Sequence, residues 1–327
     1  MKILITGVTG FIGFHVANKL IKSEFDLVGI DNVNSYYDEE LKLSRLSLLK
    51  TRGLRFLKLD ITDKYVMENL FNKENFDVII HLAAQAGVRY SIKKPHAYTE
   101  SNITGFLNIL EGARQNNIKH LIYASSSSVY GHNEKTPFSE DDTTDRPVSF
   151  YAASKKSNEM MAYSYSHLYN IPCTGLRFFT VYGPWGRPDM AYFKFVKQIL
   201  NNETINIFGQ GNMARDFTYI DDVVTALVSL IPIIPKINLK KKKFAPHEIF
   251  NIGNNKSEKL ERFIHIIERE LNKKAIRNYM EMQPGDVINT WADTKKINKV
   301  LKFSPEISIE EGLRLFIRWY KSHYKLL

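Results

Sequence analysis

The first half of the chain alternates short, mainly apolar runs with longer segments in which apolar residues recur every three or four positions. Val, Ile and Leu dominate most of the short runs, as in strands that are covered on both faces. The predicted strands are Lys2 to Thr6, Leu27 to Ile30, Arg55 to Leu59, Val78 to His81, Leu121 to Ser125 and Thr174 to Phe178. The predicted helices between them are Ile12 to Ile21, Tyr65 to Phe71, Ile103 to Asn116 and Ala152 to Tyr169. This alternation predicts an α/β fold with a doubly wound parallel sheet.

After residue 180 the alternation stops, and prolines interrupt the helices and short strands that follow. We expect a smaller, mixed but mostly helical lobe there, with residues 217–231 and 249–252 returning to the main sheet. The predicted division is a principal domain over residues 1–178, with return segments near 217–252. The second lobe is predicted over residues 179–216 and 253–327.

The segment GVTGFIG, residues 7–13, lies between the first predicted strand and the first predicted helix. Gly7 permits the tight turn, Gly10 lets the backbone approach a pyrophosphate, and Gly13 allows close packing of helix on strand. The N-terminus of the predicted helix that follows offers unpaired N–H groups, which favour phosphate groups. A glycine pattern alone is a weak signal, but its strand-turn-helix context predicts a Rossmann-like dinucleotide site.

Other candidate residues follow the carboxyl ends of strands, where open α/β sheets bind ligands. The Asp31 carboxylate can accept hydrogen bonds from the adenosine ribose and would repel a 2′-phosphate, so we expect NAD rather than NADP. Asp60 ends the third strand and could reach the adenine. Leu82 ends the fourth strand and is followed by two small residues, Ala83 and Ala84. Their size lets the backbone pass close to a ribose.

Tyr151 and Lys155 are four residues apart in a helical run and therefore share one helix face. A phenol has an ordinary pKa near 10, and we expect the nearby ammonium and a nicotinamide to lower the pKa of Tyr151. Tyr151 could then take a proton from a sugar hydroxyl. A surface pair on an amphipathic helix is the ordinary interpretation of this spacing.

Four serines at the end of the fifth predicted strand favour the catalytic interpretation. Serine is a poor strand former, so the run Ser125 to Ser128 is unusual unless it has a polar role. Ser126 is the best candidate to hydrogen-bond the reacting hydroxyl, and a polar loop without function is the alternative.

Together, the glycine turn, Asp31, HLAA, SSSSVYG and Tyr-x-x-x-Lys resemble the extended short-chain dehydrogenase/reductases that act on nucleotide sugars. The resemblance covers essentially the whole chain. Four further segments look like UDP-glucuronate 4-epimerases: DNVNSYYDEELKLSRL, HLAAQAGVRYSI, LRFFTVYGPWGRPDMA and GNMARDFTYIDDV.

The resemblance, with the strand-end positions, implies a set of site residues and no metal. Tyr151 would be the catalytic base, assisted by Lys155 and Ser126. NAD would be held by Gly7, Gly10, Phe11, Ile12, Gly13, Asp31, Asn32, Asp60, Ile61, Leu82, Ala83, Ala84, Gln85, Asn102, Tyr151, Lys155 and Phe178. The UDP-sugar would be held by Arg89, Ser127, Ser128, Thr180, Arg187, Ile207, Phe208, Arg215 and Asp286. Relatives often have an arginine where this chain has Gln283, so diphosphate binding is expected to depend more on Arg215.

The resemblance implies NAD-dependent inversion at carbon 4 of UDP-glucuronate through a 4-keto sugar. Decarboxylases and dehydratases of this family typically carry an acidic residue where this chain has Ser128, which favours return of the hydride over loss of carbon dioxide. Arg187 could pair bidentately with the sugar carboxylate, although a surface arginine is an alternative. The rival activities are 4-epimerisation of neutral UDP-glucose or UDP-N-acetylglucosamine, decarboxylation or dehydration, and net dehydrogenation.

Composition narrows the remaining classes. The formal net charge of +10 permits nucleic-acid binding, but the basic residues are scattered apart from Lys240 to Lys243, so we expect no nucleic-acid partner. One cysteine, Cys173, excludes an internal disulfide. No signal peptide and no apolar run of membrane-spanning length is evident, so we expect a cytoplasmic enzyme without a membrane partner. Relatives tend to dimerise through a four-helix bundle, which implies a homodimer built on residues 103–116 and 152–169.

Overall fold

A computed structural model describes residues 1–241 and 243–326 of the chain; Lys242, in the expected basic run, lies outside them. Seven parallel strands form the main sheet, in the order β10-β6-β5-β4-β1-β2-β3. Their bounds are β1 Lys2–Thr6, β2 Asp26–Asp31, β3 Arg55–Lys58, β4 Val78–His81, β5 His120–Ser126, β6 Cys173–Phe178 and β10 His247–Ile252. The predicted parallel α/β sheet is confirmed.

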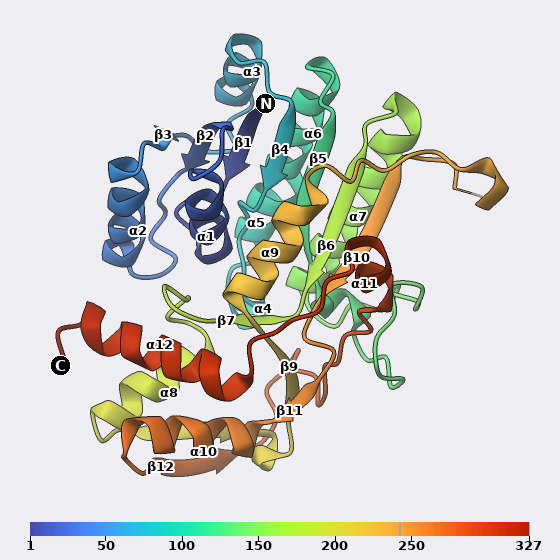
Figure 1. Cartoon of the computed structure of the whole chain (residues 1–327). Coiled ribbons are helices and arrows are strands. Elements are labelled where there is room, and N and C mark those ends of the chain that lie inside the picture. Colours follow the sequence, from blue (N-terminus) through green and yellow to red (C-terminus); the bar gives the residue numbers. More distant parts are fainter. Residues whose placement is uncertain (242, 327) are drawn as a thin grey trace.

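Helices cover both faces of this sheet, because successive side chains of each strand point to opposite faces. On β1, Ile3 and Ile5 belong to a core shared with α1, α2 and α9, whereas Leu4 belongs to a core shared with α3, α6 and α7 (Figure 1). The bounds of these helices are α1 Phe11–Leu20, α2 Glu39–Thr51, α9 Ile220–Leu230, α3 Lys64–Lys73, α6 Gly105–Gln115 and α7 Phe150–Tyr169. The sequence did not predict α2.

Short elements connect the sheet to these helices. After β4 come α4 Val88–Lys93, α5 Pro95–Tyr98 and a π-helical turn, η1 Thr99–Thr104, which runs into α6. The predicted helix from Ile103 therefore begins inside a π-helical turn, a form that is often found at functional sites. After β5, the 3₁₀ turn η2 Ser127–Tyr130 carries the second half of the serine run.

Residues beyond 178 form two small sheets with their own helices. One sheet has the order β11-β9-β7, and the other pairs β12 with β8. The strands are β7 Thr180–Tyr182, β8 Thr204–Phe208, β9 Ala214–Tyr219, β11 Ser257–Lys259 and β12 Ile276–Met280; short turns are η3 Gly209–Gly211 and η4 Leu239–Lys241. The helices are α8 Ala191–Leu200, α10 Leu260–Leu271, α11 Lys295–Leu301 and α12 Ile309–His323.

The expected return to the main sheet takes a specific form. β9, which contains Phe217, pairs with β7 and β11 rather than with the main sheet. α9 then packs against α1, and β10 pairs with β6 at the sheet edge. In Figure 1 the amino end of β1 lies on the side of the sheet away from α8, α10 and α12, so the strands run toward these helices. Across residues 1–241 and 243–326, no helix has the length and apolar character needed to span a bilayer.

Candidate active site

The glycine turn between β1 and α1 leaves little room for a Cβ at its three glycines. Gly7 has a φ of 71° and its N–H donates to the Ile30 carbonyl oxygen at 2.9 Å. A Cβ added at Gly13 would lie 2.1 Å from the Gly7 carbonyl oxygen, and one at Gly10 would lie 3.0 Å from the same atom. The turn is therefore folded tightly under the first turn of α1.

The N-terminus of α1 has features that suit a phosphate group. Gly10 provides no side-chain cap, and the first turn, which contains Phe11 and Ile12, carries no acidic residue. The buried Thr9 hydroxyl has no hydrogen-bond partner among the described residues. Helix N–H groups without an internal partner attract anions, so this cradle fits the pyrophosphate of a dinucleotide.

The polar residues after β2 and β3 form a connected group. Asp31 accepts hydrogen bonds from the N–H groups of Thr9 (3.0 Å) and Val33 (2.8 Å), so its carboxylate also fixes the glycine turn. Asn32 donates to Asp60 at 2.8 Å, and Asp60 accepts from Thr62 as well. Burial would raise the pKa of Asp60, but these hydrogen bonds outweigh it and lower the pKa.

Residues after β4 are tied to the catalytic helix through Asn102. The N–H groups of Leu82 and Ala83 donate to Thr6, and Ala84 continues this loop. Asn102, in η1, accepts from the Gln85 N–H at 2.8 Å and donates to the Ser154 hydroxyl in α7 at 2.9 Å. The loop that follows β4 is thereby held against the helix that carries Tyr151.

Ile61 and Phe178 complete the predicted cofactor set. Ile61 is buried, and its side chain lies within 2.6 Å of where a Cβ at Gly105 would stand. Phe178 ends β6 and is also buried.

Tyr151 lies in the first turn of α7, beside Ser126 at the end of β5. The Ser149 hydroxyl caps this helix by accepting from the Ala152 N–H at 3.1 Å. Burial raises the pKa of Tyr151, and it outweighs the opposing effects of the Ser126 hydrogen bond and the Arg187 charge. The expected lowering of this pKa by the protein's own ammonium is therefore wrong.

Lys155 explains the difference, because its ammonium points elsewhere. The side chain is buried, with 3% of its surface exposed, and Nζ donates to the Ala124 carbonyl oxygen at 2.9 Å. Burial lowers the pKa of Lys155 to about 8. Lys155 thus ties α7 to β5 and remains an ionisable group close to neutral pH.

This shift predicts a pH-dependent contribution to stability. The unfolded chain holds the Lys155 proton up to pH 10.5 and the folded chain only up to about 8, so stability rises with pH between these values. Relative to Lys155→Met, the wild-type free energy of unfolding should increase by about 3 kcal/mol across this window. Urea unfolding of both proteins at several pH values measures the difference, and a constant difference would contradict the assignment.

The four serines have separate roles in the structure. The Ser125 hydroxyl donates to Glu159 at 2.6 Å and is buried, so it belongs to a structural network. Ser126 donates to the Ser128 hydroxyl at 3.1 Å and accepts from the Ser128 N–H. Ser127 and Ser128 are partly exposed in η2.

Arg187 is engaged by a carboxylate of the protein. Its Nε and Nη2 atoms donate to Asp189 at 3.0 and 2.6 Å, and Tyr36 donates to the same carboxylate at 3.2 Å. Burial would lower the pKa of Arg187, but Asp189 outweighs it and raises the pKa. A sugar carboxylate must therefore use the remaining N–H groups, on Nη1 and Nη2 of Arg187, or displace Asp189. Thr180 begins β7, close along the chain to this segment.

The residues predicted to face the uridine diphosphate gather in one place, with one exception. Arg89 donates to Asp286 at 3.0 Å and lies 4.7 Å from the centre of the Phe208 ring. Arg215 donates to the carbonyl oxygens of Ala214 and Ile288. Burial lowers the pKa of Arg215, and the opposing effect of Asp286 is smaller. The side chain of Ile207 is fully buried in the core, so only its backbone could reach a uracil.

The sequence analysis missed several charged and polar groups around this site. Asp189 pairs with Arg187 and accepts a hydrogen bond from Tyr36, and α2 brings in two buried cations, Lys42 and Arg45. The signal for α2 was missed because two of its buried residues are cations. The buried residues have helical spacing only when both cations are included: Leu41, Lys42, Arg45, Leu46 and Leu49.

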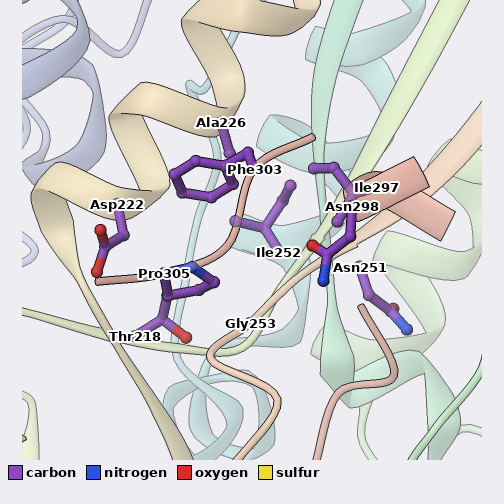
Figure 2. A pocket seen from close by; sticks show the side chains of 10 residues that line it. All are labelled: Thr218, Asp222, Ala226, Asn251, Ile252, Gly253, Ile297, Asn298, Phe303 and Pro305. Carbon is purple, nitrogen blue, oxygen red and sulfur yellow. The ribbon is translucent and has the colours of Figure 1, made fainter. Parts of the chain in front are cut away.

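A small cavity elsewhere contains none of the predicted site residues. It lies between α9, the end of β10 and residues 297–305 (Figure 2). Asp222, on its wall, accepts hydrogen bonds from the N–H groups of Glu306 and Ile307, both at 3.2 Å. This cavity lies where structural elements meet and is not part of the candidate site.

Comparison with known families agrees with this geometry. The family model described as GDP-mannose 4,6 dehydratase matches residues 4–316. The chain belongs to this family. The resemblance to the extended short-chain dehydrogenase/reductases is thereby confirmed.

Individual members of the family are similar over their full length. A probable UDP-glucuronate 4-epimerase of Rhizobium meliloti is 45% identical, with 99% of this chain and 98% of that protein covered. A crystal structure of UDP-glucuronic acid 4-epimerase from Bacillus cereus, in complex with UDP-glucuronic acid and NAD, is 35% identical with a TM-score of 0.89. The match covers 99% of this chain and 100% of that one.

The fold alone does not select the sugar within the family. UDP-glucose 4-epimerase of Thermotoga maritima, solved with UDP-glucose, is 30% identical and also has a TM-score of 0.89. That match covers 99% of this chain and 100% of the other chain. Choice of substrate must therefore be argued from individual side chains.

Proposed function

We propose that this protein is an NAD-dependent 4-epimerase that converts UDP-glucuronate to UDP-galacturonate. The observation that carries the proposal is the arrangement of Tyr151, Lys155 and Ser126 at the end of β5, beside a serine turn that lacks a carboxylate. The Rhizobium meliloti and Bacillus cereus relatives named for this activity, the latter solved with UDP-glucuronic acid and NAD, support it.

The residues around the glycine turn fit NAD. The turn between Gly7 and Gly13 and the uncapped start of α1 would hold the pyrophosphate. Asp31 would accept from the adenosine ribose, and its negative charge disfavours a 2′-phosphate. When bound, NAD supplies the hydride chemistry, and the protein supplies binding, orientation and electrostatics.

The side chains of this chain would handle the proton at carbon 4. Tyr151 would take the proton of the 4-hydroxyl, with the Ser126 hydroxyl holding the same oxygen. The phenol is costly to ionise because it is buried. Positive charge in the loaded site, from the nicotinamide and from Arg187, must therefore favour the phenolate. Inversion requires the hydride to come back to the opposite face of carbon 4, while Tyr151 would return the proton to the oxygen of that carbon.

The sugar acid would keep its carboxylate because the serine turn after β5 offers hydroxyl groups and no acidic side chain. Ser127, Ser128 and Thr180 offer hydroxyl groups, which can bind a carboxylate without protonating the adjacent carbon. Arg187 would contribute charge-assisted hydrogen bonds through the N–H groups that Asp189 leaves available on Nη1 and Nη2. These contacts favour epimerisation over decarboxylation.

The experiment is a side-by-side assay of UDP-glucuronate and UDP-glucose with the purified protein and no added NAD. We expect UDP-galacturonate from the first and much slower turnover of the second. Faster turnover of UDP-glucose would instead assign a neutral sugar, and release of carbon dioxide would assign a decarboxylase. Net formation of NADH would reveal a dehydrogenase.

The proposal includes a cytoplasmic homodimer. The two helices α6 and α7 expose apolar side chains that a four-helix bundle would cover, namely Leu107, Met160, Tyr163 and Leu168. Cys173 is buried and free, which suits a reducing compartment.

A further inference from the structure

The segment Pro184-Trp185-Gly186, immediately before Arg187, is held by two side chains from the dinucleotide-binding half. His15 of α1 binds the Pro184 carbonyl oxygen at 2.9 Å through Nε2. Arg45 of α2 donates from Nη2 to the carbonyl oxygens of Trp185 at 2.6 Å and Gly186 at 3.0 Å. Three consecutive carbonyl groups are thus bound by residues of α1 and α2.

This segment has little freedom to take another shape. Trp185 adopts a left-handed conformation with a φ of 59°, which costs free energy for a residue with a side chain. Its ring packs 5.4 Å from that of Phe14 and 5.2 Å from that of Trp319. A Cβ at Gly186 would lie 1.8 Å from the Tyr192 hydroxyl. The bound carbonyl groups therefore help to fix the position of the Arg187 backbone.

The other end of the Arg45 guanidinium reaches the glycine turn. Nη1 donates to the Thr9 carbonyl oxygen at 2.8 Å and to the Tyr37 hydroxyl at 2.7 Å. The side chain is 0% exposed, and among residues 1–241 and 243–326 no carboxylate forms an ion pair with it. A buried cation without a carboxylate partner is costly, so stability alone is a poor reason for an arginine at this position.

We propose that Arg45 is a positioning residue that fixes the segment bearing Arg187 relative to the glycine turn and thereby supports recognition of the acidic sugar. The inference rests on the proposed function, which assigns Arg187 to the sugar carboxylate. A planar guanidinium can bind both segments at once, whereas the point charge of a lysine can reach only one.

The test compares the binding of UDP-glucuronate and UDP by calorimetry, using the full-length protein saturated with NAD. UDP lacks the sugar and therefore reports the uridine site alone. Arg45→Met should weaken UDP-glucuronate binding about tenfold and change UDP binding less than about twofold. Arg45→Lys, which keeps a buried cation, should lose at least about threefold for UDP-glucuronate and provides the test if Arg45→Met fails to fold.

Two further variants separate positioning from general damage. In an Arg187→Met background, Arg45→Met should have no further effect on UDP-glucuronate binding, because residues that act through one another are not additive. Lys42→Met is the matched control: Lys42 is also a buried cation of α2, but among the described residues it donates to Asn34 and not to the segment before Arg187. It should leave the ratio of the two affinities unchanged.

Equal weakening of both ligands by Arg45→Met, or additive effects of the two arginine changes, would overturn the positioning role. An unchanged UDP-glucuronate affinity in Arg187→Met would overturn the role by removing its premise. The formation of UDP-galacturonate by the wild-type protein is a separate readout, so these failures are distinguishable from failure of the proposed function.

Discussion

Tyr151→Phe should lower kcat for epimerisation of UDP-glucuronate by about 10³-fold, the scale of a lost general acid–base group. The variant removes only the phenolic oxygen, while the ring keeps its contact with Tyr98, whose centroid lies 6.0 Å away. Binding of UDP-glucuronate and retention of NAD should therefore change little. Steady-state kinetics and calorimetry on the same preparation measure both quantities.

The matched control for this change is Tyr65→Phe in α3. Tyr65 is 79% exposed and loses the same oxygen, so the kcat of this variant should stay within about twofold of the wild type. A Tyr151→Phe enzyme that keeps a tenth or more of the wild-type kcat would exclude Tyr151 as the base.

Arg177→Met should destabilise the fold by about 3–5 kcal/mol, because it leaves the buried Glu159 carboxylate with the more distant Lys156 ammonium, 3.8 Å away, in place of a bidentate guanidinium. Arg177 and Glu159 form two hydrogen bonds of 2.8 and 2.9 Å, and their side chains are 3% and 2% exposed. Arg177 also donates to the Tyr130 hydroxyl at 3.0 Å, while Ser125 donates to Glu159. The pair therefore joins β6 and α7, and through Ser125 it also joins the end of β5.

The double variant Glu159→Leu/Arg177→Met should recover much of this loss, because an apolar pair of similar volume removes the buried carboxylate charge. Burial would raise the pKa of Glu159, and Arg177 keeps it below its ordinary value. In Arg177→Met the loss should therefore shrink as pH falls and Glu159 takes up a proton. Urea unfolding measures these free energies, with the exposed Arg318→Met as control. A loss below 1 kcal/mol for Arg177→Met would contradict the account.

The strands of the main sheet could be predicted because both faces of each strand are buried, which imposes runs of Val, Ile and Leu. Helix α2 could not be predicted in the same way, because two of its five buried positions hold Lys42 and Arg45. A search for apolar periodicity misses a helix whose buried face includes cations. These cations lie near the predicted sites for both ligands, where departures from the usual pattern are expected.

The candidate site was predictable as a set of residues at strand ends, but its electrostatics were not. The spacing of Tyr151 and Lys155 places both on one helix face, yet it does not reveal that the ammonium binds the Ala124 carbonyl. Likewise, the sequence shows Arg187 two residues before Asp189 but not that the two side chains pair. Both outcomes depend on side-chain geometry and burial, which a linear pattern does not contain.

The central claim, that hydride leaves carbon 4 and returns to the same carbon within one active site, is tested most directly with UDP-glucuronate carrying deuterium at carbon 4. The purified protein is incubated with this substrate in ordinary water without added NAD, and the UDP-galacturonate is analysed by mass spectrometry and NMR. Our account predicts that the product retains deuterium at carbon 4. Product that carries hydrogen at this position, or no product without an external oxidant, would contradict it.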